Sequence, residues 1–166
     1  MDSGREQIRF RAPRDDDWPA ILVLAELSLA ELPIVPSQRE WLQNRRSFSQ
    51  ADGVRRHFVA TSGERIVGYA CAEHRNRAAD SEYRLFVVAE PSARATLGTM
   101  LLAKLRERLI SLGARRAWFQ ELEADAGFIA YLEQKGFVRG PSFNLDDGSV
   151  LVRLTMDAPF QSLSGE

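Results

Sequence analysis

Residues 82–112, EYRLFVVAEPSARATLGTMLLAKLRERLISL, contain the pattern that decides the fold. The apolar run from Leu85 to Val88 is typical of a buried strand. A polar turn over 89–96 follows it. Leucines then recur at helical spacing, at Leu97, Leu101, Leu105, Leu109 and Leu112. The stretch therefore predicts a strand, a tight loop and a long amphipathic helix whose apolar face packs on a sheet.

The junction between this loop and this helix predicts an anion site. The first N–H groups of a helix have no intrahelical partner, and they lie at the positive end of the helix dipole. Such junctions bind phosphates and carboxylates. We therefore expect the function to centre on an anion bound just ahead of Leu97.

Length and composition indicate one globular domain over residues 1–166. The chain is 45% hydrophobic and 27% charged, which argues against disorder. A net charge of −1 gives no indication of nucleic acid or of an acidic membrane. No apolar run reaches the length of a membrane span, and the N-terminus lacks a signal pattern. Cys71, the single cysteine, excludes an intrachain disulfide and suits a buried strand in a cytoplasmic protein.

The remaining segments extend this pattern to a mixed sheet. Strand patterns occur at 8–11, 58–61, 66–72, 116–122, 137–138 and 150–154. Helices are expected after the acidic residues 15–17, after Ser37, and after Asp125. The first of these should bury Trp18, Ile21, Leu22, Ala25 and Leu29. The strand at 116–122 should run parallel to the strand at 82–88, because a helical crossover joins them. The class is α/β (α+β mixed), with about seven strands and helices on both faces.

Four segments, in this order, resemble the GNAT (GCN5-related) N-acetyltransferase family. They are IRFRAP at 8–13, followed by Asp16 and Asp17; IVGYA at 66–70; the central segment; and YLEQKGF at 131–137. The match runs over about residues 8–157, which the resemblance implies as the core of the domain. The resemblance also implies a GNAT-like acyl-CoA N-acyltransferase fold and acetyl-CoA as the cofactor. It also implies direct transfer of an acetyl group to a primary amine of a small molecule or a protein, without a metal. The expected enzyme is a cytoplasmic N-acetyltransferase.

The cofactor loop departs from the family pattern V-x-P-x-x-(R/Q)-G-x-G-x-(G/A). Aligned without gaps from Val88 to Gly98, the chain has Arg94 and Thr96 where the family has glycines. Aligned instead from Pro91, Arg94 falls on the Arg/Gln position, but the loop is one residue short. A Thr in a conformation with positive φ would be strained by roughly 1–2 kcal/mol. Thr96 therefore has an ordinary conformation, or the loop takes another route.

The resemblance also implies the residues that bind the cofactor. Arg94 is either a phosphate contact or a solvated loop residue, and Asp125 either contacts the cofactor arm or only caps a helix. A backbone amide near Val88 is the expected donor to the thioester oxygen. The expected cofactor-binding set is Phe86, Val87, Val88, Arg94, Ala95, Thr96, Leu97, Gly98, Thr99 and Asp125.

Two catalytic residues are expected. Glu82 is the candidate general base, because even spacing places it on one strand face with Arg84 and Phe86. The alternative is an exposed Glu at the start of a strand, with His74 as a second candidate base. Tyr131 is the candidate general acid, one residue before the position where the family often has Tyr; the alternative is core packing with a polar tip.

Other readings of the sequence remain open. The degenerate loop favours a non-catalytic GNAT-fold module for ligand sensing or assembly, which binds CoA weakly or not at all. Nucleic-acid binding is disfavoured, because the arginines are scattered and matched by acids. A homodimer stays open, and the acceptor amine is not specified by any motif.

Overall fold

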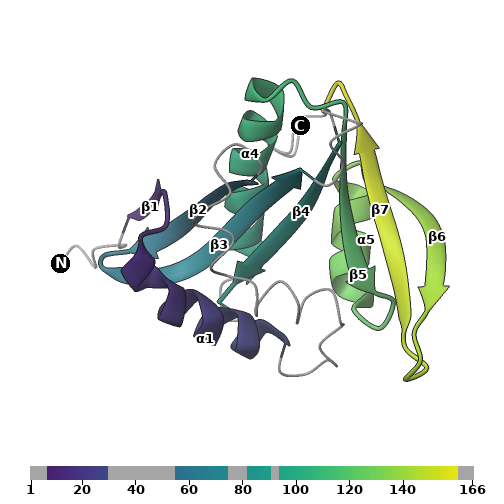
Figure 1. The fold of residues 1–166 in the computed structure, drawn as a ribbon, viewed down its shortest axis with the longest axis horizontal. Helices are drawn as coiled ribbons and strands as arrows, with labels where there is room; N and C mark the ends of the chain where they lie inside the picture. Colours follow the sequence, from purple (N-terminus) through teal and green to yellow (C-terminus); the bar gives the residue numbers. More distant parts are fainter. Residues whose placement is uncertain (1–6, 30–54, 75–81, 91–93, 161–166) are drawn as a thin grey trace.

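The computed structural model describes residues 7–29, 55–74, 82–90 and 94–160 (Figure 1). The helix expected after Ser37 lies outside these residues. The described strands and helices follow the predicted order. Its elements are β1 (Ile8–Arg11), the 3-10 turn η1 (Asp15–Asp17), α1 (Trp18–Leu29), β2 (Arg55–Ser62), β3 (Arg65–His74), β4 (Glu82–Ala89), α4 (Arg94–Ser111), β5 (Arg116–Leu122), α5 (Ala126–Gln134), β6 (Val138–Asn144) and β7 (Val150–Asp157).

The seven strands form one sheet in the order β1-β2-β3-β4-β5-β7-β6. β4 and β5 pair in parallel, as the crossover through α4 requires, and the other neighbours are antiparallel. The predicted mixed α/β sheet is confirmed. None of the helices within the described ranges is long and apolar enough to span a membrane.

Helices cover both faces of the sheet (Figure 1). α4 and α5 lie on one face, where Leu97, Leu101, Leu105 and Leu109 are buried, as the leucine spacing predicts. Leu112 is partly buried at the edge of the same core. Gly113 then ends α4 with a φ of +67°, which suits the predicted C-cap.

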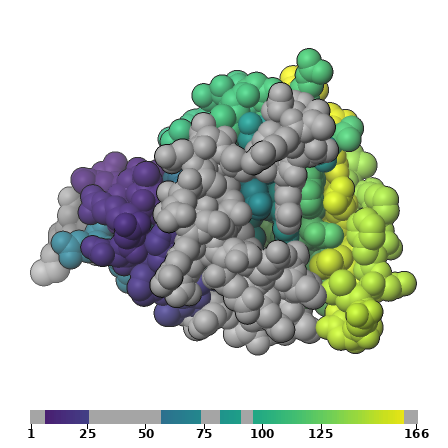
Figure 2. Space-filling model, in the orientation of Figure 1, coloured from purple at the N-terminus to yellow at the C-terminus, as the bar shows by residue number. Residues whose placement is uncertain are grey.

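α1 lies on the opposite face, over β2, β3 and β4. Ile21, Leu24 and Ala25 are buried there, together with Cys71 of β3. The predicted stripe named Leu22, which is only partly buried, in place of Leu24. Both leucines follow Ile21 within one turn, so the sequence pattern alone did not distinguish which of them faces the sheet. Figure 2 shows this side of the molecule, with α1 at one end and β6 and β7 at the other.

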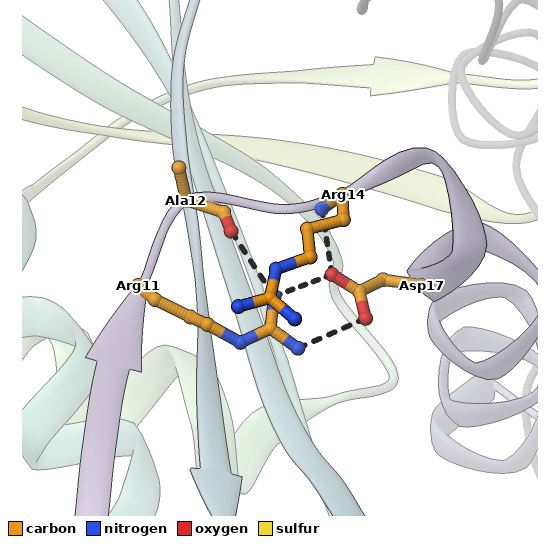
Figure 3. A network of polar contacts seen from close by, with 4 residues as sticks. All are labelled: Arg11, Ala12, Arg14 and Asp17. Carbon is orange, nitrogen blue, oxygen red and sulfur yellow. Dashed lines mark hydrogen bonds and ion pairs between the residues drawn. The ribbon is translucent and has the colours of Figure 1, made fainter. Parts of the chain in front are cut away.

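An ion pair joins the end of β1 to the start of α1 (Figure 3). The Asp17 carboxylate accepts hydrogen bonds from Arg11 Nη1 at 2.6 Å and Arg11 Nη2 at 3.0 Å. It also accepts one at 2.6 Å from the backbone N–H of Arg14. The hydrogen bond from Arg11 lowers the pKa of Asp17, and burial opposes that shift. Of the acidic residues at 15–17, Asp17 is therefore the one that ties the helix start to the preceding strand.

Candidate active site

The parallel ladder between β4 and β5 is short. It pairs Glu82 with Arg116, Tyr83 with Ala117, and Arg84 with Trp118. Beyond these pairs β4 continues along β3 and β5 continues along β7, so the two strands diverge toward their carboxyl ends (Figure 1). The sheet therefore opens between its two parallel strands, at the end where the chain enters α4.

Main-chain groups of Val87 face this opening. The N–H of Glu90 donates to the carbonyl of Val67 at 2.9 Å. This bond shows which residues of β4 hydrogen-bond to β3 in the antiparallel ladder. Because ladder bonds alternate, Phe86 and Val88 bond toward β3, and Val87 points its N–H and carbonyl toward β5. The β4–β5 ladder has ended before Val87. Of the main-chain groups near Val88, those of Val87 therefore face the opening, and a donor to the thioester oxygen there stays a prediction.

Helix α4 begins at Arg94, three residues before the predicted start at Leu97. Thr96 lies in its first turn, and none of the described non-glycine residues has a positive φ. The apparent conflict between Thr96 and a glycine-rich loop is thus resolved: the residue is helical and unstrained. The N–H groups of the first turn, from Arg94 to Leu97, have no acceptor within the helix. The side chains of Arg94 and Ala95 lie outside the described part of the structure.

Gly98 adjoins unfilled space. The residue itself is buried, yet a Cβ added to it would meet no atom of the described residues within 4 Å. Its φ is ordinary, so a turn does not require glycine here. The glycine instead leaves room beside the first turn of α4.

Tyr131 of α5 reaches across to α4. Its hydroxyl lies 2.7 Å from the Thr99 hydroxyl, and the bond is partly buried. The Tyr131 ring is stacked on Phe128, with centroids 6.2 Å apart, and Lys135 Nζ lies 5.5 Å from its centroid. These contacts place the proposed acid and Thr99, both expected at the site, together on the α4–α5 face. The sequence did not indicate that they bond to one another.

Asp125 occupies the N-cap position of α5, as the sequence predicts. Its side chain makes no capping hydrogen bond, although its carbonyl accepts the N–H of Ile129 at 3.1 Å. Position alone therefore agrees with the predicted cap. A contact between Asp125 and a cofactor stays a prediction.

Glu82 lies at the closed end of the β4–β5 ladder, opposite Arg116. Arg116 Nε donates to Asp157 at 2.7 Å, and this bond raises the pKa of Arg116, with a smaller contribution from Glu82. Glu82 precedes Phe86 by four residues, which is about 13 Å along a strand. The predicted base therefore shares the α1 face of β4 but lies well before Val87. The side chain of His74 lies outside the described residues.

A cation–aromatic cluster on the α1 face was missed from the sequence. The Arg153 guanidinium carbon lies 4.1 Å from the centroid of the Trp118 ring, and that of Arg84 lies 5.6 Å from it. Trp118 and Arg84 are both more than 90% buried. The alternation of Trp118 with the core residues Ala117 and Phe119 is a signal in the sequence. The pairing of β5 with β7, which brings Arg153 beside it, is not.

Comparison with known proteins identifies the family. The model of the Acetyltransferase (GNAT) family matches residues 19–137. The chain belongs to the GNAT acetyltransferase family. No curated protein matches it in sequence. Its expected family and fold are confirmed, and it is an acetyltransferase by family.

Solved structures of low sequence identity share this fold. A candidate GNAT acetyltransferase from Desulfovibrio desulfuricans is 18% identical, with a TM-score of 0.75, over 91% of this chain and 99% of that one. The Salmonella typhimurium protein yncA, solved with its cofactor acetyl-CoA, is 15% identical, with a TM-score of 0.75, over 93% and 96%. The ribosomal-protein-S18-alanine N-acetyltransferase from Escherichia coli is 18% identical, with a TM-score of 0.71, over 94% and 97%.

Acetyl-CoA is the cofactor of this family, in agreement with the sequence prediction. The residues present fit its chemistry at two points. The first-turn amides of α4 suit a pyrophosphate, and the open space at Gly98 adjoins them. The main chain of Val87 offers a donor and an acceptor where the sheet opens, which suits an amide-containing arm laid along β4.

Proposed function

We propose that the protein is an acetyl-CoA-dependent N-acetyltransferase that transfers an acetyl group directly to a primary amine of a small molecule or a protein. The observation that carries this proposal is the divergence of β4 and β5 beyond the Arg84–Trp118 pair. It leaves the main chain of Val87 facing the opening, at the end of the sheet where α4 begins. Solved neighbours named for ribosomal protein S18 alanine and for spermidine both act on amines, which supports this acceptor class.

The chain would hold the cofactor through its backbone rather than through a glycine-rich loop. The first turn of α4, from Arg94 to Leu97, would bind the pyrophosphate, and Val87 would hydrogen-bond the arm. Bound acetyl-CoA supplies an acetyl group activated as a thioester. Thr96 does not oppose this arrangement, because helix N-terminal amides are available whatever side chain they carry.

Glu82 and Tyr131 are assigned to opposite faces of the sheet. An alkyl amine with a pKa near 10.4 is almost wholly protonated at neutral pH and must lose a proton before it attacks. Glu82 lies on the α1 face, about 13 Å before Phe86 along the strand, which is too far for direct contact with an amine held beside Phe86. It would therefore accept the proton through intervening water. Tyr131 lies on the α4–α5 face with its hydroxyl 2.7 Å from Thr99 Oγ1, and it would serve as the general acid for the thiol that leaves.

The second candidate is a non-catalytic module of the same fold. Two features favour it: Arg94 and Thr96 replace family glycines, and the hydroxyl of Tyr131 already bonds Thr99. The two functions differ in whether acetyl-CoA binds and turns over. Cys71, buried in β3, supports a cytoplasmic location for either one.

Calorimetric titration with acetyl-CoA tests the proposal, followed by a screen of amines for release of free thiol. We expect saturable binding and amine-dependent thiol release. Gly98→Leu should fill the space beside α4 and weaken acetyl-CoA binding about tenfold or more. The matched control is Ser111→Leu, which adds the same side chain at an exposed position at the far end of the same helix. No heat of binding at millimolar acetyl-CoA would refute the enzyme and favour the module.

A further inference from the structure

The α1 face of the sheet carries two arginines on one tryptophan ring. Arg84, Trp118 and Arg153 come from β4, β5 and β7. Their strand neighbours Ala117, Phe119, Val152 and Leu154 belong to the core on the α4–α5 side, so the cluster lies on the other face. The guanidinium carbons of Arg153 and Arg84 lie 4.1 Å and 5.6 Å from the Trp118 centroid.

Two buried hydrogen-bond donors in this cluster have no acceptor among the residues that the structure describes. Trp118 Nε1 and Arg153 Nε are shielded from solvent, and neither has a hydrogen-bond partner within the described part of the chain. Trp118 is only 6% exposed. Buried donors are almost always paired, so an unpaired one calls for a missing acceptor. Both groups can only donate, and the missing partner must therefore be a hydrogen-bond acceptor.

Among the described residues, strand pairing places an acid opposite Arg84 but not opposite Arg153. Arg84 lies directly opposite Glu73 of β3, so its charge has an acidic neighbour on the same face. Arg153 lies opposite Gln120 of β5, which is neutral. A guanidinium in such a setting is matched best by a carboxylate or a similar planar or tetrahedral anion.

The cluster also lies at a defined place relative to the opening in the sheet. Arg84 and Trp118 form the last pair of the β4–β5 ladder, and beyond them the strands diverge. The unpaired donors are therefore at the base of the opening. They lie on the face with α1, opposite the face where α4 and α5 would bind the cofactor.

We propose that the acceptor is an amine that also carries a carboxylate-class anion, and that Arg153 and Trp118 bind this anion at the base of the β4–β5 opening. The inference rests on the proposed acetyltransferase function and names its substrate class. The site would accept amino acids and similar anionic amines more readily than polyamines, because Arg153 repels the positive charges of a polyamine. Carboxylates and phosphonates share the required chemistry.

Paired acceptors test the substrate class. The panel consists of the common amino acids with their carboxamides, 4-aminobutanoate with butylamine, 3-aminopropylphosphonate, and spermidine. Thiol release with acetyl-CoA gives kcat and KM for each. We expect at least one anionic amine to exceed its uncharged partner by about tenfold or more in kcat/KM, and spermidine to be poor. The phosphonate arm shows which anion is preferred. Equal rates within every pair would overturn the inference and leave the acetyltransferase intact.

Variants test the residues. Arg153→Gln should raise KM for the preferred anionic amine roughly 10- to 100-fold, leave kcat little changed, and leave the uncharged partner unaffected. Trp118→Phe keeps a ring beneath Arg153 but removes the N–H, and should raise the same KM by a smaller factor. Arg108→Gln, at an exposed position on α4, is the matched control. Circular dichroism checks that each variant is folded. An unchanged KM in folded Arg153→Gln would overturn the assignment.

Direct binding separates this inference from the proposed function. The preferred anionic amine is titrated calorimetrically into the protein without cofactor; if no amine is acetylated, each anionic amine of the panel is titrated. Binding that Arg153→Gln weakens would support the anion site even in a protein that does not bind acetyl-CoA. Binding of acetyl-CoA with no binding of any anionic amine, and with no rate preference, would refute the anion site alone.

Discussion

Replacement of Gly68 by Ala should loosen the contact between β3 and α4. A Cβ at this position would lie 2.9 Å from Leu101 Cδ1, 3.4 Å from Ala60 Cβ and 3.5 Å from the carbonyl oxygen of Val88. Carbon atoms in proteins normally approach to about 3.5–4.0 Å. Leu101 is fully buried, so it has little room in which to move away. The substitution therefore overpacks the contact between Gly68 of β3 and Leu101 of α4.

The expected cost follows from two opposing effects. Overpacking of a core costs about 1–3 kcal/mol, whereas Gly→Ala in a strand recovers about 0.5–1 kcal/mol of backbone entropy. We expect Gly68→Ala to lower the free energy of unfolding by about 1 kcal/mol, and the melting temperature by about 2–4 °C. Urea unfolding followed by circular dichroism measures the change as a lower midpoint at an unchanged slope.

A matched control and a double variant sharpen this test. Gly127→Ala lies in α5, where an added Cβ meets no atom of the described residues within 4 Å, and it should raise stability by roughly 0.5–1 kcal/mol. Leu101→Ala alone should cost about 2–5 kcal/mol, and combining it with Gly68→Ala should recover about 1 kcal/mol, because the new methyl group enters the vacated space. A Gly68→Ala protein as stable as the parent, or strict additivity in the double variant, would refute the close-packing argument.

Three further predictions concern single contacts. Asp17→Asn should cost about 1 kcal/mol at neutral pH, because Arg11 is partly exposed and solvent screens the pair. The pKa of Asp17 is lowered in the folded state, so this stabilisation is present above the unfolded pKa of about 3.9 and is lost as pH falls through the lower folded pKa. Urea titrations of parent and variant from pH 7 to pH 2.5 should converge at the acid end, and a constant difference would contradict the ion pair. Tyr131→Phe should lower kcat about tenfold or more with little change in acetyl-CoA affinity. Thr99→Val removes only the hydroxyl partner of Tyr131 and should lower kcat less. Equal losses of kcat in the two variants would favour a purely structural role for this hydrogen bond. Gly113→Ala places a side chain at a φ of +67° and should cost about 1 kcal/mol, measured as a lower urea midpoint; a neutral result would contradict the C-cap.

Local patterns in the sequence were sufficient for most of the fold. The spacing of Leu97, Leu101, Leu105 and Leu109 predicted a helix on a sheet, and all four leucines are buried. Such spacing depends only on residues within one segment of the chain, so it predicts a helix without knowledge of what the helix packs against. The start of the helix was less accurate, because Arg94, Ala95 and Thr96 were aligned with a glycine loop although their residue types allow a helix.

The candidate site was predicted only in part, for the same physical reason. Motif alignment identified the stretch from Phe86 to Thr99, but not which amide faces the opening. That choice depends on the hydrogen bond from Glu90 to Val67, which is made by the partner strand. The bond between Thr99 and Tyr131 likewise joins residues 32 positions apart. Neither bond can be predicted from the local sequence pattern.

The sequence by itself determined the family, the order of the elements and most of the residues that face the core, because each of these follows from periodicity or from a contiguous motif. Only the tertiary structure decided that the main chain of Val87 faces the opening between β4 and β5, that Thr96 is helical, and that Arg153 lies on Trp118. These depend on which strands become neighbours and in what register. Neighbours in a sheet are chosen by the burial of the whole core, and residues far apart in the chain determine that burial together.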